Sequence, residues 1–363
     1  MAMEKNHACL LYGARDARFE DIPVPSLEGK PRDVLIRIAF TGVCGSDVHF
    51  WVHGGINEMV RPGNPVALGH EASGVVEAVG SAVSKVKVGD RVSIEPGFPC
   101  RHCSFCLGGK YNLCPDMTFA ASPGPGAVVH GTLATFYRLP DDFCYKLPGD
   151  MALDEGVIFE PLAVAVHGLR LAKLKPGQNV LVLGAGPVGL LSCAVAREFG
   201  ASRITVVDIN KGRLSFAEDV LDIPTYRYDM EKSPKDNAVA LATEKNLQEG
   251  ADVIVEATGV ESCVQMGVEA IKRGGSYVQV GLGKKMVEFP LVVMSEKEIT
   301  VRGCFRYGPG DFKLASTLVS RGKIPLKSFI TKVFPFHRAP DAWEAAHKGE
   351  GVKILIQVDG SQT

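Results

Sequence analysis

Four cysteines stand close together in the segment PCRHCSFCLGGKYNLC, at the spacing C-x2-C-x2-C-x7-C; they are Cys100, Cys103, Cys106 and Cys114. Four thiolates at such short spacing favour a closed, tetrahedral zinc site that pins a loop without taking part in catalysis. An iron–sulfur cluster is an alternative, although the final C-x3-C-P of ferredoxins is missing. Disulfides are less favoured, because cysteines so close in sequence bridge poorly. Unliganded thiols are a further alternative that is less favoured than zinc. We therefore expect structural zinc.

A glycine-rich turn with the sequence GAGPVG matches the pattern GxGxxG. It follows the apolar run NVLVL and precedes a stretch with helical spacing, which is the context that a dinucleotide-binding turn requires. Gly184 permits the tight turn, Gly186 lets the backbone approach a pyrophosphate, and Gly189 lets the helix pack closely on the strand. The amino terminus of that helix favours the negative charge of the phosphates. The residues predicted to bind the cofactor here are Gly184, Gly186, Pro187, Val188 and Gly189.

An acidic residue, Asp208, ends the next apolar run, about 20 residues after the turn, as the dinucleotide pattern requires. A carboxylate at this point accepts hydrogen bonds from both ribose hydroxyls and repels a 2′-phosphate, so NAD is expected rather than NADP. Arg213 lies nearby, and an arginine can stack on the adenine or approach a phosphate. The alternative for Asp208 is a cap at the end of the strand, without a ligand.

A second group of metal-ligating types is Cys44 in TGVCGSDVH with His70 and Glu71 in LGHEASG. Each alone would more often be a core or structural residue. Beside a nicotinamide domain, metal binding becomes the favoured interpretation of these three residues. An alcohol must become acidic before it is oxidised, and a zinc ion with an open position makes it acidic by acting as a Lewis acid. Glu160, in the apolar run VIFEPL, is either a charge at the start of a helix or a group at the metal, bound directly or through water.

Two kinds of pattern divide the chain and must position these residues. Up to about Pro148, short alternating runs separated by Gly and Pro predict strands of a small barrel or sandwich, among them 34–38, 74–80 and 90–94. From about residue 155, apolar strands alternate with helical stretches, which predicts a parallel sheet covered on both faces. The strands are expected at 179–183, 204–207, 251–255 and 276–280, and one helix at 188–199. After about Glu298, mixed short elements could rejoin the first region.

The bulk composition bounds the class of protein. The chain has 363 residues, 46% hydrophobic and 22% charged, with a formal net charge of −1. The length favours two domains, and the charge balance argues against nucleic acid as a partner. No apolar run approaches the length of a membrane span. The amino terminus lacks the apolar region of a signal peptide, and ten cysteines favour a reducing compartment, so we expect a cytoplasmic protein.

The motifs GVCGSDVH, GHEASG, the four-cysteine segment, FEPLAVAVH, GAGPVG and CFRYGPGD occur together and in this order. With them the chain resembles the zinc-dependent medium-chain dehydrogenases, and among these the polyol branch of sorbitol and xylitol dehydrogenases, over nearly its whole length. The resemblance implies an α/β fold with two domains. A β-rich, GroES-like catalytic domain would comprise residues 1–157 and 298–363, with a structural zinc lobe at 97–116. A Rossmann domain, a doubly wound parallel sheet, would be inserted at 158–297.

The resemblance also implies roles at the catalytic metal. Cys44, His70 and Glu71 would hold the zinc, with Glu160 close by. Ser46 would take up the proton of the substrate hydroxyl, and the alternative for Ser46 is a helix cap. His49 matches a relay histidine that would pass the proton towards solvent.

Other residues would read the substrate. Arg306 and Tyr307 would hydrogen-bond the hydroxyl chain, and a site built in this way rejects analogues that lack a hydroxyl. Phe50, Phe119 and Glu160 would line the pocket. Tyrosine is common at the position of Phe50 in sorbitol dehydrogenases. The phenylalanine lacks the hydroxyl of that tyrosine, which weakens the expected preference for polyols.

The implied reaction is oxidation of a secondary hydroxyl of a polyol to a ketose with NAD, xylitol to D-xylulose being the expected case. The alternatives within the class are L-arabinitol 4-dehydrogenase, sorbitol dehydrogenase and threonine dehydrogenase. From another class, a non-enzymatic NAD-binding protein on the same fold is opposed by the retained metal ligands and Ser46. The implied cofactors are NAD and two zinc ions, one catalytic and one structural. A homo-oligomer is expected, a tetramer first and a dimer next.

Overall fold

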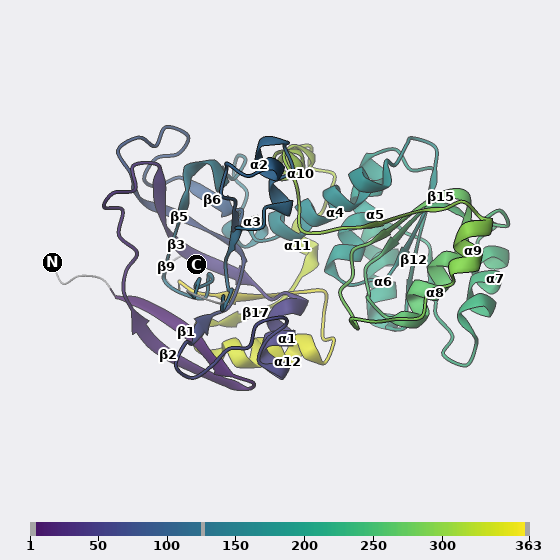
Figure 1. Cartoon of the computed structure of the whole chain (residues 1–363), viewed down its shortest axis with the longest axis horizontal. Coiled ribbons are helices and arrows are strands. Elements are labelled where there is room, and N and C mark those ends of the chain that lie inside the picture. Colours follow the sequence, from purple (N-terminus) through teal and green to yellow (C-terminus); the bar gives the residue numbers. More distant parts are fainter. Residues whose placement is uncertain (1–4, 125–127, 360–363) are drawn as a thin grey trace. The chain divides into compact units, whose positions relative to one another are not determined.

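The computed structural model describes residues 5–124 and 128–359 (Figure 1). It contains two compact units. Unit 1 comprises Met1–Glu160 and Leu326–Thr363, and unit 2 comprises Pro161–Pro325. Compared with the predicted domains, the units differ most at the second boundary, which was expected at residue 298. Unit 2 extends beyond it because β16 (Thr300–Gly303) hydrogen-bonds in parallel to β15 (Ile271–Gln279).

Unit 1 is built on a seven-stranded sheet in the order β10-β6-β5-β3-β18-β17, with β9 also paired to β3. Its pairs are antiparallel except β17 with β18. A three-stranded sheet, β2-β1-β4, and the pair β7-β8 complete the unit. The strands are β1 (Asn6–Gly13), β2 (Asp16–Ile22), β3 (Asp33–Gly42), β4 (Val66–Ala67), β5 (Glu71–Val79), β6 (Arg91–Ile94), β7 (Gly97–Phe98), β8 (Thr118–Phe119), β9 (Phe136–Pro140), β10 (Cys144–Lys146), β17 (Ile330–Pro335) and β18 (Lys353–Gln357).

The strands expected at 34–38, 74–80 and 90–94 are confirmed as β3, β5 and β6. The carboxyl-terminal segment rejoins the first region through β18, which pairs with β3, as its mixed pattern suggested. The helices of this unit are α1 (Gly45–His53), α2 (Ser104–Leu107), α3 (Leu153–Gly156), α11 (Leu326–Phe329) and α12 (Ala339–His347). The rings of Trp51 in α1 and Trp343 in α12 pack at 5.2 Å between centroids, within a core cluster that fixes α1.

Unit 2 holds a six-stranded sheet in the order β13-β12-β11-β14-β15-β16, and every pair in it is parallel. The predicted parallel sheet is therefore confirmed. Its remaining strands are β11 (Asn179–Leu183), β12 (Arg203–Asp208), β13 (Thr225–Arg227) and β14 (Ala251–Glu256). The helices are α4 (Phe159–Ala172), which begins in unit 1, α5 (Pro187–Glu198), α6 (Lys211–Leu221), α7 (Pro234–Glu244), α8 (Glu261–Ala270), α9 (Leu291–Glu296) and α10 (Asp311–Ser320).

Helices cover both faces of this sheet. In Figure 1, α5 and α6 lie on one side of it and α7 and α8 on the other. The strand order reverses between β11 and β14, since β12 and β13 lie on one side of β11 and β14 to β16 on the other. Open α/β sheets bind ligands at the carboxyl ends of the strands at such a switch point. The glycine-rich turn follows β11, so the topology places it there.

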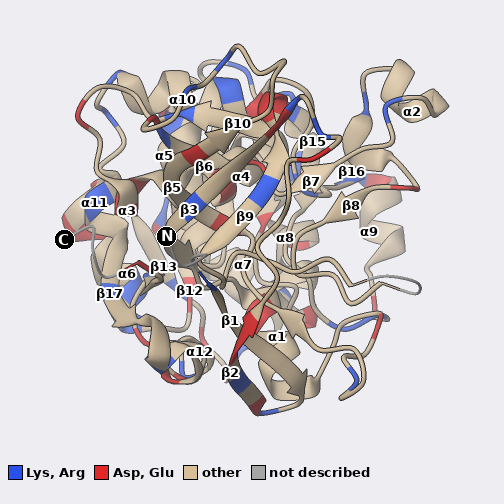
Figure 2. Cartoon of the chain, turned by 90° about the vertical axis from the view of Figure 1, so that its left-hand side faces the viewer, with Lys and Arg blue, Asp and Glu red and all other residues tan. Residues whose placement is uncertain are grey.

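Charges are spread over the chain without separation of sign. In the view of Figure 2, segments with Lys and Arg alternate with segments with Asp and Glu, in keeping with the net charge of −1. Within the described ranges, no helix has the length and apolar character needed to cross a bilayer.

Candidate active site and metal centres

Cys44, His70 and Glu71 come together in unit 1. Cys44 is the N-cap of α1, and His70 and Glu71 lie at the start of β5. One ligand atom of each lies within 4.8 Å of the other two. Cys44 is half-buried, whereas His70 and Glu71 are buried. Sulfur, imidazole nitrogen and carboxylate oxygen are all zinc ligands, and three protein ligands leave one position open, so the residues fit a catalytic zinc.

Asp47 ties two ligand segments together, and the sequence analysis missed it. Its Oδ2 accepts the backbone N–H of Cys44 at 2.9 Å, and its Oδ1 accepts that of Gly69 at 3.2 Å. The same Oδ1 lies 3.6 Å from Nδ1 of His70. Burial lowers the pKa of His70, but Asp47 and Cys44 together raise it more, so the net shift is well upwards. A carboxylate behind a ligating histidine fixes its ring. The signal was local, since Asp47 stands at the third helical position, where it closes a capping box.

Lys353 in β18 forms an ion pair with Glu71. No local sequence pattern indicated this contact. The Nζ of Lys353 donates to Oε2 of Glu71 and, at 3.1 Å, to the carbonyl oxygen of Val43. Burial lowers the pKa of Lys353, while Glu71, Cys44 and Glu160 raise it, and the net direction is upwards. Gly42 in β3 gives this pair its room: a Cβ there would overlap Oε2 of Glu71 and lie 3.0 Å from Cε of Lys353.

The predicted proton-transfer residues lie on the helix that Cys44 begins. Ser46 is half-buried in the first turn of α1, and His49 is exposed one turn later. Nδ1 of His49 lies 2.9 Å from the carbonyl oxygen of Gly55. Glu160 is buried in the first turn of α4, so its charge stands at a helix start. It does not belong to the three-residue ligand group, but it contributes to the raised pKa of Lys353.

The two predicted pocket phenylalanines have different surroundings. The ring of Phe119, in β8, lies 5.6 Å from that of His70 between centroids, so it borders the ligand group. Phe50 is half-buried and packs against the core cluster that contains Trp51 and Trp343.

The four clustered cysteines converge as predicted. One ligand atom of each lies within 4.8 Å of the others. Sγ of Cys106 lies 3.9 Å from that of Cys100 and 3.4 Å from that of Cys103. A tetrahedral zinc with Zn–S bonds of about 2.3 Å sets its sulfurs about 3.8 Å apart, whereas a disulfide needs about 2.05 Å. The thiols are free, and the separations fit zinc.

Backbone N–H groups that donate to sulfur support metal binding by these thiols. The backbone N–H of Cys100 donates to Sγ of Cys114 at 3.3 Å, and that of Cys103 to Sγ of Cys100 at 3.4 Å. A hydrogen bond from the backbone of His102 is the main cause that lowers the pKa of Cys100 to about 6, while loss of solvent raises the pKa of Cys106 to about 12. Four adjacent thiolates need a cation, which a coordinated metal supplies.

In unit 2, the turn after β11 has the shape that its glycines predict. Gly184 has φ +102°, and a Cβ on it would meet Thr258 at 2.7 Å. A Cβ on Gly189 would overlap the carbonyl oxygen of Gly184, so α5 can approach only because this residue is glycine. At Gly186, the N-cap of α5, a Cβ would meet nothing within 4 Å. The backbone is open there to a phosphate, at a helix amino terminus that favours its charge.

Asp208 contacts this turn, and Arg213 follows it in the first turn of α6. Asp208 is half-buried at the end of β12. Its Oδ2 accepts the backbone N–H of Ala185 at 2.7 Å, and its Oδ1 that of Asn210 at 2.8 Å. The Nε of Arg213 is buried without a hydrogen-bond partner in the described structure. A ligand at this edge of the sheet would offer it one, so these residues fit a dinucleotide.

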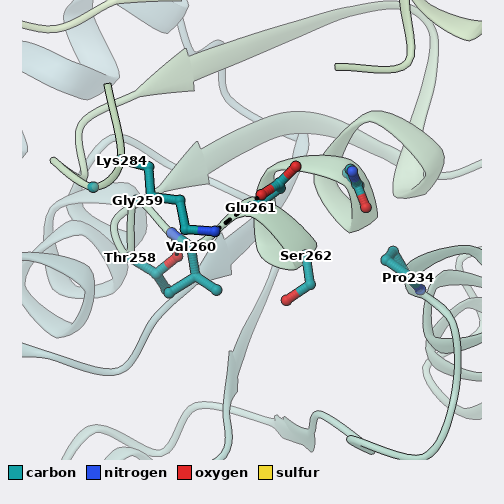
Figure 3. A pocket seen from close by; sticks show the side chains of 9 residues that line it. Pro234, Thr258, Gly259, Val260, Glu261, Ser262 and Lys284 are labelled. Carbon is teal, nitrogen blue, oxygen red and sulfur yellow. Dashed lines mark hydrogen bonds and ion pairs between the residues drawn. The ribbon is translucent and has the colours of Figure 1, made fainter. Parts of the chain in front are cut away.

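A pocket opens at the carboxyl ends of β14 and β15 (Figure 3). Its lining includes Thr258, Val260, Ser262, Pro234 and Lys284. In Figure 3, Lys284 extends past Gly259 towards Glu261, at 3.5 Å between Nζ and Oε2.

Glu256, which the sequence analysis missed, shapes this end of the sheet. It is fully buried and accepts the backbone N–H groups of Thr258 at 2.8 Å and Gly259 at 2.9 Å. Thr258 in turn packs against Gly184, so Glu256 supports the glycine turn from behind.

Comparisons with known proteins agree with this geometry. The model of the alcohol dehydrogenase GroES-like domain matches residues 30–149, and that of zinc-binding dehydrogenases matches residues 187–321. The chain is 50% identical to the probable D-xylulose reductase A of Aspergillus fumigatus over 355 residues, 98% of this chain and 97% of that protein. The chain belongs to the zinc-binding dehydrogenases.

Two further known proteins are similar to this dehydrogenase over nearly its whole length. D-xylulose reductase A of Aspergillus niger is 49% identical over 352 residues, 97% of this chain and 96% of that protein. The crystal structure of an Escherichia coli oxidoreductase/dehydrogenase of unknown specificity is similar with a TM-score of 0.89 and 34% identity, over 98% of this chain and 99% of that one. The expected fold class, a GroES-like domain with a Rossmann domain, is thereby confirmed, and the protein is an oxidoreductase.

In unit 2 of the dehydrogenase, Arg306 and Tyr307 lie in the loop between β16 and α10. Arg306 has φ +57°, and its guanidinium lies 4.6 Å from the ring centroid of Phe305. Tyr307 is buried, and its ring packs edge-on against Phe312 at 4.8 Å. A left-handed residue that is not glycine needs support from its surroundings.

A buried carboxylate, Asp311, supplies that support, and the sequence analysis missed it. It is fully buried and accepts the backbone N–H of Gly308 at 2.7 Å and Nδ1–H of His167 at 2.8 Å. Arg170 also donates to it and, at 3.1 Å, to the carbonyl oxygen of Pro309. The loop with Arg306 and Tyr307 is therefore tied to α4.

Proposed function

We propose that this dehydrogenase oxidises a secondary hydroxyl of a polyol to a ketose with NAD, and that its substrate and product are xylitol and D-xylulose. The observation that carries the proposal is the conjunction of the Cys44, His70 and Glu71 group with near-full-length relatives named D-xylulose reductase A at 49–50% identity. L-Arabinitol and sorbitol are the rival substrates, because their dehydrogenases would use the same metal ligands.

The proposed division of labour follows the positions of the side chains. Zinc, when bound by Cys44, His70 and Glu71, would act as a Lewis acid on the substrate hydroxyl. Ser46 lies two residues after Cys44 on α1 and would accept the proton. His49 is exposed on the same helix and would pass that proton to solvent. Glu160, buried in α4, would add negative charge near the metal and contact the substrate.

The proposed substrate contacts beyond the metal are polar and aromatic. Phe119 would cover one side of the pocket beside His70, and Phe50 would cover another. Arg306 and Tyr307 would hydrogen-bond the polyol hydroxyls. The proposed domains are a catalytic domain of residues 1–157 and 298–363 and a Rossmann domain of residues 158–297. The compact unit 2 nevertheless includes Arg306 and Tyr307.

NAD is the proposed cofactor because a carboxylate, Asp208, stands at the carboxyl end of β12. It would accept hydrogen bonds from the ribose hydroxyls and repel a 2′-phosphate. The turn from Gly184 to Gly189, with Pro187 and Val188 opening α5, would hold the pyrophosphate, and Arg213 would lie alongside. The second proposed zinc is structural, held by Cys100, Cys103, Cys106 and Cys114.

We propose a cytoplasmic homo-oligomer, a tetramer first and a dimer next. Its ten cysteines are all free thiols, which suits a reducing compartment. Unit 2 exposes Leu282, Met286, Leu291, Val292 and Val301, the last of them in the edge strand β16. Exposed apolar side chains and an edge strand each favour association.

The test is NADH formation by the purified protein with xylitol, L-arabinitol, sorbitol and 2-butanol. The expected result is the highest kcat/KM with xylitol and a large loss with 2-butanol, which offers no hydroxyls beyond the reacting one. Equal or better turnover of 2-butanol would refute the polyol proposal, while the metal and cofactor assignments would stand. A preference for L-arabinitol or sorbitol would keep the polyol class and change the substrate.

A further inference from the structure

Two exposed histidines, His49 and His53, lie one turn apart on α1. The i, i+4 spacing puts both rings on the same face of the helix. Their ring centroids are 4.6 Å apart, with 53° between the ring planes. Neither residue belongs to the ligand group of Cys44, His70 and Glu71.

The separation of the two rings suits a shared metal ion. With Zn–N bonds of about 2.0–2.1 Å and tetrahedral angles, two imidazoles on one zinc place their centroids about 5 Å apart. The observed distance of 4.6 Å between the ring centroids lies close to this value. Histidines at i and i+4 on a helix face are also the pair that zinc-binding helices use.

The hydrogen bond of His49 prepares its free nitrogen as a ligand. The carbonyl oxygen of Gly55 can only accept, so the short contact of 2.9 Å places a proton on Nδ1 of His49. The lone pair of the neutral ring is then on Nε2. Ligating histidines typically donate their other N–H to a carbonyl or carboxylate, which fixes the tautomer and the ring.

The carbonyl group of Gly55, which accepts from His49, is positioned by the turn that ends α1. Gly54 caps α1 in the left-handed conformation with φ +80°, and its N–H donates to the carbonyl oxygen of Phe50 at 2.7 Å. Gly55 then forms an isolated bridge with Met59. The turn that follows α1 therefore orients the first histidine of the pair from outside the helix.

We propose that His49 and His53 form a third metal site, which takes one divalent transition-metal ion such as Zn²⁺ in addition to the catalytic and structural zinc ions. Two Nε2 atoms and water molecules would complete its coordination. Occupation of the site slows turnover, because a metal on Nε2 of His49 removes the lone pair that the proton relay needs. This regulatory consequence rests on the proposed function, whereas the binding itself does not.

The binding test uses the full-length protein loaded with two zinc ions per chain and titrated with further Zn²⁺ by calorimetry. We expect one additional saturable site. His53→Gln removes one ligand from the exposed end of the helix and leaves His49 and its hydrogen bond intact. It should weaken the added site by at least roughly tenfold, the loss that even an outer-shell partner causes. His337→Gln, at another exposed histidine of unit 1, is the matched control and should bind as the unaltered chain does.

The regulatory test measures the initial rate of polyol oxidation against added Zn²⁺. The unaltered chain and His337→Gln should lose activity over the concentration range in which the third ion binds. His53→Gln should keep its basal rate and need at least about tenfold more zinc for the same loss. No third site in the titration, or an unchanged third site in His53→Gln, would overturn the proposal. Lost binding with unchanged inhibition would overturn only the regulatory part. A protein inactive towards every polyol would refute the proposed function, and calorimetry would still decide the metal site.

Discussion

Lys353 and Glu71 form an ion pair inside unit 1, with side-chain exposures of 2% and 3%. The pair joins β18 to β5 across β3, at the point where Gly42 leaves room for it. The carboxylate of Glu71, which we propose as a zinc ligand, is thus held by the buried ammonium group of Lys353. The negative charges of Glu71, Cys44 and Glu160 outweigh the effect of burial, so the pKa of Lys353 is raised and the ammonium stays charged.

The first prediction concerns Lys353→Met. This variant removes the ammonium and leaves the Glu71 carboxylate buried without its partner. Loss of one member of a buried pair costs about 3–5 kcal/mol, so the free energy of unfolding of the zinc-free protein should fall by that amount. Bound zinc offers Glu71 another cation, and the loss should be smaller in the zinc-loaded protein. Denaturant unfolding with and without a chelator measures both values.

Lys332→Met is the control for this variant, because Lys332 pairs with Glu350 on the surface at side-chain exposures of 41% and 43%. Exposed pairs contribute about 0–1 kcal/mol. Equal losses in the two variants, or a loss at Lys353 that zinc does not reduce, would contradict the role assigned to the buried pair.

The second prediction concerns the four-cysteine site. Cys103→Ser removes one of its thiolates, so the zinc content should fall by one ion per chain and the catalytic metal should remain. The melting temperature should fall, by about 2–4 °C for each kcal/mol lost in a unit of the size of unit 1, because metal binding at such a site stabilises the fold. Elemental analysis and thermal unfolding measure the two effects. Cys263→Ser, outside both metal groups, should keep its zinc; an unchanged midpoint in Cys103→Ser would refute the structural role.

Short motifs predicted the parts of the site that are close in sequence. The four cysteines and the turn from Gly184 to Gly189 each lie within one short segment. Cys44 and the adjacent pair of His70 and Glu71 were found through two separate motifs, TGVCGSDVH and LGHEASG. The strands beside them were also foreseen, since their apolar patterns are set by burial on one or both faces.

Residues whose role depends on tertiary pairing were not foreseen. Lys353 lies 282 positions after Glu71, and a lysine in a carboxyl-terminal strand is usually exposed. Its role follows from the pairing of β18 with β3, which no local pattern encodes. Asp311 and His167 are 144 positions apart, and only the packing of α10 near α4 brings them together. The strand β16 was likewise hidden, because its partner β15 decides which unit it joins.

The third prediction concerns the choice of nucleotide. Asp208→Asn keeps the size of the side chain and an acceptor for one of the two backbone N–H groups, that of Ala185 or that of Asn210, but removes the charge. The ratio of kcat/KM with NAD to that with NADP should fall at least about tenfold, which corresponds to about 1.4 kcal/mol. Asp219→Asn, on the exposed side of α6, should leave the ratio unchanged. If the ratio in Asp208→Asn equals that of the unaltered chain, Asp208 does not select the cofactor.

The fourth prediction concerns the loop with Arg306 and Tyr307. The buried carboxylate of Asp311 accepts hydrogen bonds from Gly308, His167 and Arg170 through its two oxygens. Asp311→Asn leaves one oxygen and an NH2 group, so the variant cannot accept all three bonds as the carboxylate does. The loop should then lose its fixed conformation, including the left-handed backbone of Arg306. We expect the KM for the polyol to rise by about tenfold or more, since misplaced polar contacts to substrate hydroxyls cost at least about 1.4 kcal/mol. The KM for NAD should change little.

Steady-state kinetics with both substrates varied separate these two constants, and thermal unfolding shows how much of the change is a general loss of stability. Asp341→Asn, which breaks the exposed pair of Asp341 with Arg338, is the matched control and should alter neither KM. Equal rises in the two KM values of Asp311→Asn would point to a disturbed Rossmann unit rather than a loosened loop. An unchanged KM for the polyol would instead remove Arg306 and Tyr307 from substrate binding, because the loop can serve that role only while Asp311 holds it in place.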